Sequence, residues 1–434
     1  MNVEPVPSLN PHRQLEAIQM LTVPEMQPIF QKISSKYLYW DKVKYMAPEG
    51  VDREVLWHAV KIQRAFNVQH IKFGGHVFHF TVTKNMLALL HEFDMNFGGS
   101  LGTKNIIPTA DKNYYLVSSI MEEAIASSQM EGASTTRRIA KDMLRKQLKP
   151  TNKSQQMIVN NYETINRISK CSEEDFSVNA LLDIHCSISS KTLDNPEDEG
   201  VFRRNDDILV VDGVNGEVAH TPPPHTEIDE MINDLCSFAN HDSHDDFIHP
   251  VIKGIIIHFI LAYIHPFADG NGRTARSLFY WYMIKKGYWL TEYLSISRVI
   301  YTNKRAYERA FLYTEHDEND LSYFIQYHLD VMKKAFEELK KYLQCKIDEQ
   351  QNMLRFAGIA NINERQRYVV RTILEGKRAL FTPKELATQF DVSPKSARTD
   401  LQDLVKMGYL SMTSLNKRAV GYVKSDQFEE LLKR

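Results

Sequence analysis

The segment His265-Pro-Phe-Ala-Asp-Gly-Asn-Gly-Arg-Thr-Ala-Arg276 concentrates residue types that can act on a phosphate group. His265 titrates near neutrality, so its imidazole can deprotonate an incoming hydroxyl. Asp269 can hold Mg²⁺, an ion that prefers one or two carboxylates together with phosphate oxygens. A base and a metal ligand this close together indicate phosphoryl or nucleotidyl transfer.

The second half of the segment adds the features of an anion site. Gly270 and Gly272 flank Asn271, and glycines allow backbone N–H groups to approach an anion closely. An apolar helical pattern begins directly afterwards, so a helix N-terminus adds a favourable dipole. Arg273 and Arg276, three residues apart on one side of that helix, can clamp further phosphate oxygens. An ordinary glycine-rich loop with solvent-facing arginines is the simpler alternative, but it does not account for the whole combination.

Eight positions of this segment match the pattern His-x-Phe-x-(Asp/Glu)-Gly-Asn-Gly-Arg-x-x-Arg, which is the signature of the Fic family. The resemblance implies that His265 is the base and that Asp269 holds Mg²⁺ on the phosphates of ATP. It also implies roles for the remaining motif residues: an anion hole made by Gly270, Asn271 and Gly272, a β-phosphate contact by Arg273 and a γ-phosphate contact by Arg276. Related death-on-curing kinases carry a lysine in place of Gly272, which argues against kinase activity. Phosphocholine transfer stays open as an alternative reaction.

A second short pattern precedes the motif. Ser127-Ser-Gln-Met-Glu-Gly132 matches the Fic inhibitory pattern (Ser/Thr)-x-x-x-Glu-(Gly/Asn), at the end of a helix expected over 113–132. The resemblance is to class II Fic proteins, in which an N-terminal helix restrains the core. It implies that Glu131 pairs with Arg276 and blocks the productive γ-phosphate position. Taken alone, Glu131 would be interpreted as a solvated residue at a helix end.

The resemblance extends to two further regions. The segment from Gly200 to Pro224 resembles the flap, a β-hairpin that positions the target side chain, and His220 and Thr221 are expected near the nucleotide. Tyr307 and Thr314 fall where family members line the adenine pocket, although Tyr307 could equally be a core aromatic of its helix. His258, in the apolar helix before the motif, is interpreted as a core histidine because no second metal ligand lies at suitable spacing.

The expected fold is mainly helical, with a Fic helical core, a short β-hairpin flap and a small C-terminal winged helix-turn-helix domain. A chain of 434 residues exceeds one ordinary core. The boundaries are an N-terminal helical extension over 1–112, a catalytic core over 113–325, a connecting helix over 326–360 and a winged helix domain over 361–434. No chemistry of its own is expected of the N-terminal extension.

The C-terminal domain follows the order helix, helix, turn, helix and hairpin, which is typical of a winged helix. Residues 361–434 hold 14 Lys and Arg against 9 Asp and Glu, a net charge of +5. The expected recognition helix, Pro394 to Met407, carries Lys395, Ser396, Arg398 and Lys406, and the wing carries Lys417 and Arg418. This distribution is compatible with DNA phosphates and a major groove. Winged helices also mediate protein contacts or dimerisation, so both interpretations stay open.

The whole chain has the composition of a soluble globular protein, with 43% hydrophobic residues and a formal net charge of −2. Its four cysteines lie far apart without a CxxC pair, which favours reduced thiols in a cytoplasmic protein. No signal peptide is expected at the N-terminus, and the longest apolar stretch, 254–264, is too short to span a bilayer. No membrane association is therefore expected.

The function that these features predict is transfer of AMP from Mg-ATP to a Ser, Thr or Tyr hydroxyl of a target protein or of the chain itself. Glu131 is expected to keep the enzyme restrained. The alternative is a DNA-binding regulator whose Fic core senses nucleotide, and the intact His265 favours catalysis because a sensor needs no base. A homodimer is expected by family analogy only.

Overall fold

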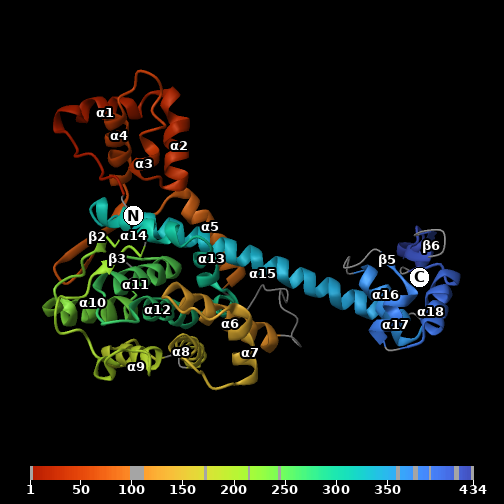
Figure 1. Ribbon diagram of the computed structural model, residues 1–434. Coiled ribbons are helices and arrows are strands. Elements are labelled where there is room, and N and C mark those ends of the chain that lie inside the picture. Colours follow the sequence, from red (N-terminus) through yellow and green to blue (C-terminus); the bar gives the residue numbers. More distant parts are fainter. Residues whose placement is uncertain are drawn as a thin grey trace. The chain divides into compact units, whose positions relative to one another are not determined.

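The computed structural model describes residues 3–97, 112–170, 174–213, 216–242, 246–357, 362–374, 380–390, 392–414 and 420–431. The chain divides into two compact units, Met1–Leu339 and Lys340–Arg434 (Figure 1). The fold is mainly helical, as the sequence predicts, and the described residues include three small sheets. The long helix α15 (Ser322–Ala357) crosses the boundary between the units.

The larger unit begins with four helices and a hairpin. Its elements are α1 (Gln14–Leu21), α2 (Gln27–Lys36), α3 (Trp40–Val43), α4 (Arg53–Ala65), β1 (Val68–Phe73), β2 (His76–Thr81) and α5 (Lys84–Phe97). The antiparallel hairpin lies within the extension that was expected to be helical, and it buries Phe73, Phe78 and Phe80. Backbone hydrogen bonds between His79 and the turn before α15 attach the hairpin to the rest of the unit.

The helices that follow surround the motif. They are α6 (Lys112–Met130), α7 (Arg137–Lys146), α8 (Lys153–Ile168), α9 (Val178–Ser189), α10 (Ile228–Asn240), α11 (Pro250–Ile264), α12 (Asn271–Lys285), α13 (Ile296–Thr302) and α14 (Lys304–His316). A short hairpin, β3 (Val210–Val211) and β4 (Val218–His220), lies in the segment expected to form the flap, with a register irregularity between its two pairs.

Helices α11 and α12 lie side by side at the centre of the larger unit (Figure 1). The sequence of α11, Pro-Val-Ile-Lys-Gly-Ile-Ile-Ile-His-Phe-Ile-Leu-Ala-Tyr-Ile, is apolar on almost every side, which is typical of a helix buried all round. Gly254 allows close packing of the pair, because a β-carbon there would lie 3.1 Å from the Tyr282 ring. The motif loop therefore joins two closely packed helices.

The smaller unit contains α16 (Glu364–Leu374), β5 (Leu380–Phe381), α17 (Pro383–Phe390), α18 (Pro394–Lys406), β6 (Leu410–Ser414), β7 (Val420–Lys424) and α19 (Phe428–Leu431). Its antiparallel sheet has the order β5-β7-β6, and β5 was not expected from the sequence. Val369, Leu401, Leu404 and Tyr422 belong to a core that this unit forms by itself. Lys417 and Arg418 of the expected wing, and likewise Cys171, lie outside the described residues.

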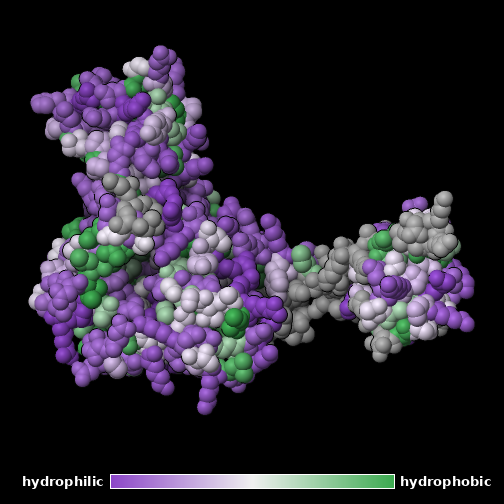
Figure 2. All heavy atoms as spheres, in the orientation of Figure 1, coloured by the Kyte–Doolittle hydropathy of each residue, from purple (hydrophilic) through white to green (hydrophobic). Residues whose placement is uncertain are grey.

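The face of the protein drawn in Figure 2 is mainly hydrophilic, with apolar side chains gathered over the region of β2 and β3. Leu209, Val211 and Val218, in and beside the short hairpin, are each about half exposed. Within the part of the chain that the structure describes, no helix is both long enough and apolar enough to cross a membrane.

Candidate active site between α6, α11, α12 and α14

The loop that joins α11 to α12 is closed by its own side chains. Asn271 accepts a hydrogen bond from the Phe267 N–H (2.9 Å) and donates one to the Phe267 carbonyl (2.8 Å). Gly270 caps the start of α12 with φ of +85°, a left-handed conformation that glycine adopts without strain. The side chain of Asn271 therefore holds the turn, and its expected contact with phosphate stays a prediction.

His265 ends α11 in the left-handed conformation, with φ of +50°, and its half-buried ring lines a cavity. Its Nδ1 lies 3.2 Å from the Ala262 carbonyl. A carbonyl only accepts hydrogen bonds, so Nδ1 carries the proton and Nε2 keeps its lone pair. Burial lowers the pKa of His265 to about 4, against the opposing effect of the Ala262 carbonyl. The ring is therefore neutral at physiological pH and can accept a proton.

The two arginines of the motif have different surroundings. Arg273 is fully buried and donates from Nη1 to the Ile188 carbonyl (3.1 Å). Among the described residues, its Nε and Nη2 have no hydrogen-bond partner, and Nη2 has only an ion-pair contact with Asp269 at 3.9 Å. Because a buried donor without a partner is costly, this guanidinium is suited to a further anion.

Arg276, in contrast, is occupied by the end of α6. Its Nε donates to Ser127 Oγ (2.8 Å), and its Nη2 donates to the Ser127 carbonyl (3.0 Å) and to Glu131 Oε1 (2.7 Å). The structure thus brings Ser127 and Glu131 of the inhibitory pattern into contact with Arg276 of the motif. Burial opposes the ionisation of Glu131, but Arg276 outweighs it and holds the pKa of Glu131 below its ordinary value.

The Glu131 carboxylate also lies against the first turn of α12. A β-carbon at position 272 would overlap this carboxylate, with its Cδ atom only 2.9 Å away. The first N–H groups of a helix have no partner within the helix, and its dipole favours negative charge there. Glu131 therefore occupies the anion-binding end of α12, and Gly272 leaves the space for it.

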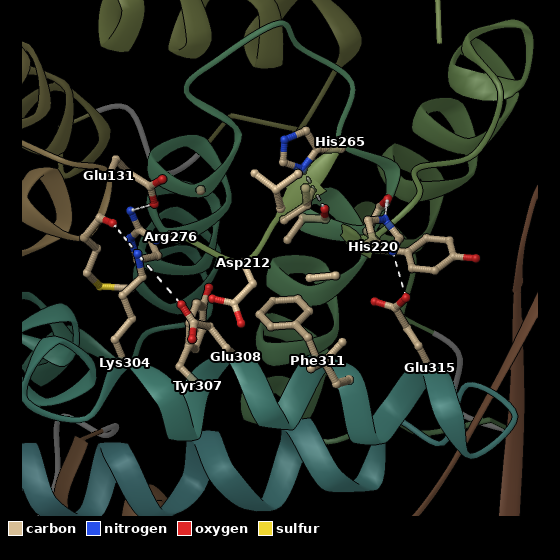
Figure 3. A pocket seen from close by; sticks show the side chains of 18 residues that line it. Glu131, Asp212, His220, His265, Arg276, Lys304, Tyr307, Glu308, Phe311 and Glu315 are labelled. Carbon is tan, nitrogen blue, oxygen red and sulfur yellow. Dashed lines mark hydrogen bonds and ion pairs between the residues drawn. The ribbon is translucent and has the colours of Figure 1, made fainter. Parts of the chain in front are cut away.

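A cavity of about 280 Å³ extends from Glu131 to the short hairpin (Figure 3). Helix α14 supplies one wall through residues spaced three or four apart on one face: Lys304, Tyr307, Glu308, Phe311, Leu312 and Glu315. The opposite wall comes from the ends of α6 and α11 and from β3 and β4. Glu131 and Arg276 lie at one end of the view and His220 with Glu315 at the other, so the cavity is polar at both ends.

Tyr307 lines this cavity and also contacts a buried histidine. Its hydroxyl lies 2.9 Å from Nε2 of His258, which is completely buried. His258 thus contacts the cavity through Tyr307, a role that its spacing in the sequence does not reveal. Thr314 does not line the cavity, since it is buried and donates to the Ala310 carbonyl within α14.

His220 lines the far end of the cavity with both ring nitrogens engaged. Nδ1 lies 2.8 Å from Glu315 Oε2, and Nε2 lies 2.8 Å from the Tyr263 carbonyl. Both partners are acceptors, so the ring is satisfied when it carries two protons. Burial disfavours that charged form, but the Glu315 carboxylate outweighs burial and raises the pKa of His220. Thr221, the other residue expected near the nucleotide, is exposed and does not line the cavity.

Two residues outside the motif support it and were not found from the sequence. Arg203 is buried, and it donates from Nε to the His265 carbonyl (3.0 Å) and from its backbone N–H to the Pro266 carbonyl (2.8 Å). It also donates to the Pro223 carbonyl, so it connects both ends of the flap segment to the motif. His185 contacts the motif turn from the other side. Neither residue lies near the motif in sequence.

Asp269 is suited to a metal ion that arrives with a ligand of its own. Its Oδ1 accepts from the Gly270 N–H, and the side chain is 53% exposed. Among the described residues, no group of three or more His, Cys, Asp or Glu side chains could hold a metal ion without further ligands. A single carboxylate completed by phosphate oxygens and water is an arrangement that Mg²⁺ accepts.

Comparisons with known proteins match the part of the chain that contains the motif. The Fic/DOC family profile matches residues 175–283. Proteins named protein adenylyltransferase Fic from Drosophila sechellia, Drosophila simulans and Drosophila melanogaster are 31% identical to this chain over 114 residues. That stretch is 26% of this chain and only 21% of each relative, so the match spans about a fifth of their length.

Solved structures of Fic proteins are among those that this chain matches. A Fic family protein from Desulfovibrio desulfuricans has a TM-score of 0.49 and 17% identity, covering 80% of this chain and 97% of its own. Fic-1 from C. elegans has a TM-score of 0.48 and 18% identity, covering 79% of this chain and 90% of its own. With the motif geometry and the profile match together, residues 175–283 of this chain form a domain of the Fic/DOC family.

Proposed function

We propose that this chain transfers AMP from Mg-ATP to a hydroxyl of a protein side chain. The observation that carries the proposal is the placement of His265. Its neutral ring, with the Nε2 lone pair, lines the same cavity as Gly272 and Arg276 at the start of α12. A base beside an anion-binding helix end is what nucleotidyl transfer to a hydroxyl requires. The named relatives support the choice of AMP.

In the proposed reaction, the target hydroxyl oxygen forms a bond to the α-phosphorus of ATP. The bond from that phosphorus to the bridging oxygen breaks, pyrophosphate leaves, and the hydroxyl proton passes to Nε2 of His265. Arg273, with two donors unpartnered among the described residues, stabilises the negative charge on the phosphates. Mg²⁺, which Asp269 would hold, supplies positive charge to the same phosphates. The acceptor is a Ser, Thr or Tyr of another protein or of the chain itself.

We further propose that Glu131 restrains this activity, as in class II Fic proteins. A carboxylate on Arg276 competes with a phosphate for the same N–H donors, and it also fills the space next to Gly272. The parent chain should therefore bind ATP but transfer AMP slowly until the end of α6 moves. Opening the site requires Arg276 to lose its hydrogen bonds to Ser127 or Glu131.

Incubation with ATP labelled at the α-phosphate tests both proposals. Glu131→Gly should label itself or proteins of a lysate far more strongly than the parent, and adding His265→Ala should abolish the label. Glu308→Ala is the matched control, because it removes a carboxylate from the same cavity without freeing Arg276. A parallel incubation with labelled CDP-choline separates AMP transfer from phosphocholine transfer. The absence of any label from Glu131→Gly would refute the catalytic proposal.

A second function is favoured by one face of α18 in the smaller unit. Lys395, Ser396, Arg398 and Thr399 are exposed on its N-terminal half, while Ala397 and Leu401 pack into the core. We propose that this unit is a winged helix and that the exposed face contacts duplex DNA, since a helix that presents base-contacting and phosphate-contacting side chains can enter the major groove.

Binding of the full chain to duplex DNA at several salt concentrations tests this second function. The double variant Lys395→Ala/Arg398→Ala should bind more weakly, and each lost phosphate contact should reduce the salt slope by about 0.9. Lys424→Ala serves as a control, because this lysine lies in β7 and pairs with Glu429 of α19. Equal DNA binding by the parent and the double variant would exclude this face of α18 as the DNA contact.

A further inference from the structure

His185 of α9 contacts two segments near the cavity, the motif turn and the start of the flap segment. Its Nε2 lies 2.8 Å from the Asp269 carbonyl, and its Nδ1 accepts a hydrogen bond from the Gly200 N–H at 3.0 Å. Its ring stacks flat on Phe267, with 3.6 Å between the ring centroids and an angle of 1° between the planes. The side chain is completely buried. It therefore joins the motif turn to the residue from which the flap segment starts.

Only one protonation state of His185 satisfies both hydrogen bonds. The Gly200 N–H must donate, so Nδ1 offers its lone pair, and the Asp269 carbonyl must accept, so Nε2 carries the proton. Each nitrogen therefore has a separate role, since Nε2 holds the motif turn and Nδ1 holds the start of the flap segment. Two amide side chains can imitate these roles one at a time, because the amide of Gln reaches the position of Nε2 and that of Asn the position of Nδ1.

The hydrogen bond from His185 to the Asp269 carbonyl fixes the backbone turn that carries the Asp269 carboxylate. The Asp269 side chain accepts from the Gly270 N–H, so its direction depends on the backbone between these two residues. His185 packs tightly there, since a β-carbon at Gly270 would lie 3.4 Å from its Nε2. Holding a carbonyl next to a ligating carboxylate is how residues behind a metal site tune its affinity.

The hydrogen bond from the Gly200 N–H to His185 fixes the start of the flap segment. Gly200 has φ of +71°, and a β-carbon there would lie 3.0 Å from Cβ of Cys186 and 3.2 Å from the Leu182 carbonyl, so the backbone is pressed against α9. Three residues later, Arg203 bonds to the His265 carbonyl and to Pro223 at the far end of the flap segment. The start of the flap segment therefore has two anchors, one on α9 and one on the motif.

We propose that His185 is a positioning residue that couples the Mg²⁺-binding turn at Asp269 to the flap segment. This proposal rests on the proposed function for the identity of its ligand, Mg-ATP. Nε2 of His185 keeps the Asp269 carboxylate in the orientation that suits the metal. Nδ1 keeps the flap segment ordered from Gly200 onward, so one side chain links nucleotide binding to the surface that receives the target.

Three variants separate the two roles. His185→Gln keeps a donor for the Asp269 carbonyl and loses the acceptor for Gly200. His185→Asn keeps the acceptor for Gly200 and loses the donor for Asp269. His185→Phe keeps a ring to stack on Phe267 and loses both hydrogen bonds. The Gln and Asn variants form a matched pair with the same chemical group, so a general loss of stability affects them alike.

The test measures ATP binding by calorimetry over a series of Mg²⁺ concentrations, in the full chain with and without Glu131→Gly. It also measures hydrogen exchange of the amides of residues 201–213. His185→Asn should raise the Mg²⁺ concentration needed for ATP binding about tenfold while flap exchange stays near that of the parent. His185→Gln should show the opposite: normal Mg²⁺ dependence and faster flap exchange. His185→Phe should show both defects.

Equal behaviour of the Asn and Gln variants in both measurements overturns the proposal, whether both match the parent or both are merely less stable. If the Phe variant fails to fold, the Asn and Gln pair still decides the question. Failure of the proposed function looks different: Glu131→Gly would then bind Mg-ATP without transferring AMP, or not bind it at all. Hydrogen exchange of residues 201–213 without nucleotide still reports the His185–Gly200 link in that case.

Discussion

Glu131 and a side chain at position 272 cannot occupy the same space. Gly272 is the second glycine of the motif, and its missing β-carbon leaves the volume that the Glu131 carboxylate fills. The same absence would allow phosphate oxygens to approach the first turn of α12. Under the proposed function, one glycine would serve both a restrained state with a carboxylate in place and an active state with a phosphate in place.

Gly272→Ala should accordingly destabilise the parent chain by about 1–2 kcal/mol, because the added methyl group forces the Glu131 carboxylate away from the buried Arg276. In a Glu131→Gly background the same substitution should cost much less, since nothing fills the space. Urea unfolding of the four chains of this double-mutant cycle gives the coupling free energy. A coupling free energy near zero would show that Glu131 does not stay against Gly272 in solution.

The residues of the motif could be predicted from the sequence because they form one continuous segment with its own turn chemistry. The pairing of Glu131 with Arg276 followed from family resemblance, and the structure places the two in contact. His185 and Arg203 could not be predicted in this way. Each acts through backbone groups of residues far along the chain, and only the packing of α9 and of the flap segment against the loop brings them there.

At the scale of elements, α6 is held in place by buried contacts as well as by Arg276. Glu123 accepts from the Ser297 N–H (2.9 Å) and from the Ser297 hydroxyl at the start of α13, and burial raises the pKa of this carboxyl. The neighbouring Glu122 pairs instead with Arg137 and Lys141 of α7. The two adjacent glutamates therefore connect α6 to two different helices, α13 and α7.

Glu123→Ala should therefore loosen α6 and raise basal AMP transfer, although less than Glu131→Gly does. The loss of these buried hydrogen bonds should also lower the free energy of unfolding by about 2–3 kcal/mol. Glu122→Ala is the matched control, since it releases α7 and leaves the contact with α13 intact. Transfer from α-labelled ATP measures the effect, and an unchanged rate in Glu123→Ala would mean that the Arg276 contacts alone set the restraint.

The hairpin strand β4 is anchored through His220, and this anchor depends on pH. The pKa of His220 is raised in the folded chain, so its contribution to stability is complete below the unfolded value of about 6.5. The contribution is then lost as pH rises through the raised folded value. Glu315 and the Tyr263 carbonyl face the ring, while the charge of Arg203 opposes its protonation.

The difference in unfolding free energy between the parent and His220→Gln should consequently shrink as pH rises from the unfolded pKa of about 6.5 through the raised folded pKa of His220. Urea unfolding at a series of pH values measures this difference. In Glu315→Gln the pH dependence should largely disappear, because the carboxylate that favours the charged ring is gone. A difference that grows with pH would assign the anchor to a neutral His220.

Helices were easier to predict than strands for physical reasons. The continuous apolar run of α11 and the apolar periodicity of α12, α16 and α18 are local information, and caps such as Ser393 mark where helices start. Strands β3 and β5 have two residues each, and β5 pairs with β7 about 40 positions away. So short a strand has no periodicity of its own. Its pairing depends on a sheet that exists only after the unit has folded.

At the scale of the whole molecule, the two compact units have separate hydrophobic cores. The core of the smaller unit includes side chains of α16, α17, α18 and the sheet β5-β7-β6. The candidate active site lies entirely within Met1–Leu339. Nucleotide binding should therefore stabilise one unit without direct effect on the other, because a ligand stabilises only the folded state that binds it.

Calorimetric unfolding of the full chain should show two transitions, of which Mg-ATP raises only the one that belongs to the larger unit. At a concentration of 100 times Kd the expected stabilisation is about 2.7 kcal/mol. Arg273→Ala, which removes the buried guanidinium from the anion site, should abolish this shift and leave the second transition unchanged. If nucleotide shifted both transitions together, the two units would unfold as one. Nucleotide binding would then affect the stability of the smaller unit, which would favour the nucleotide-sensing alternative.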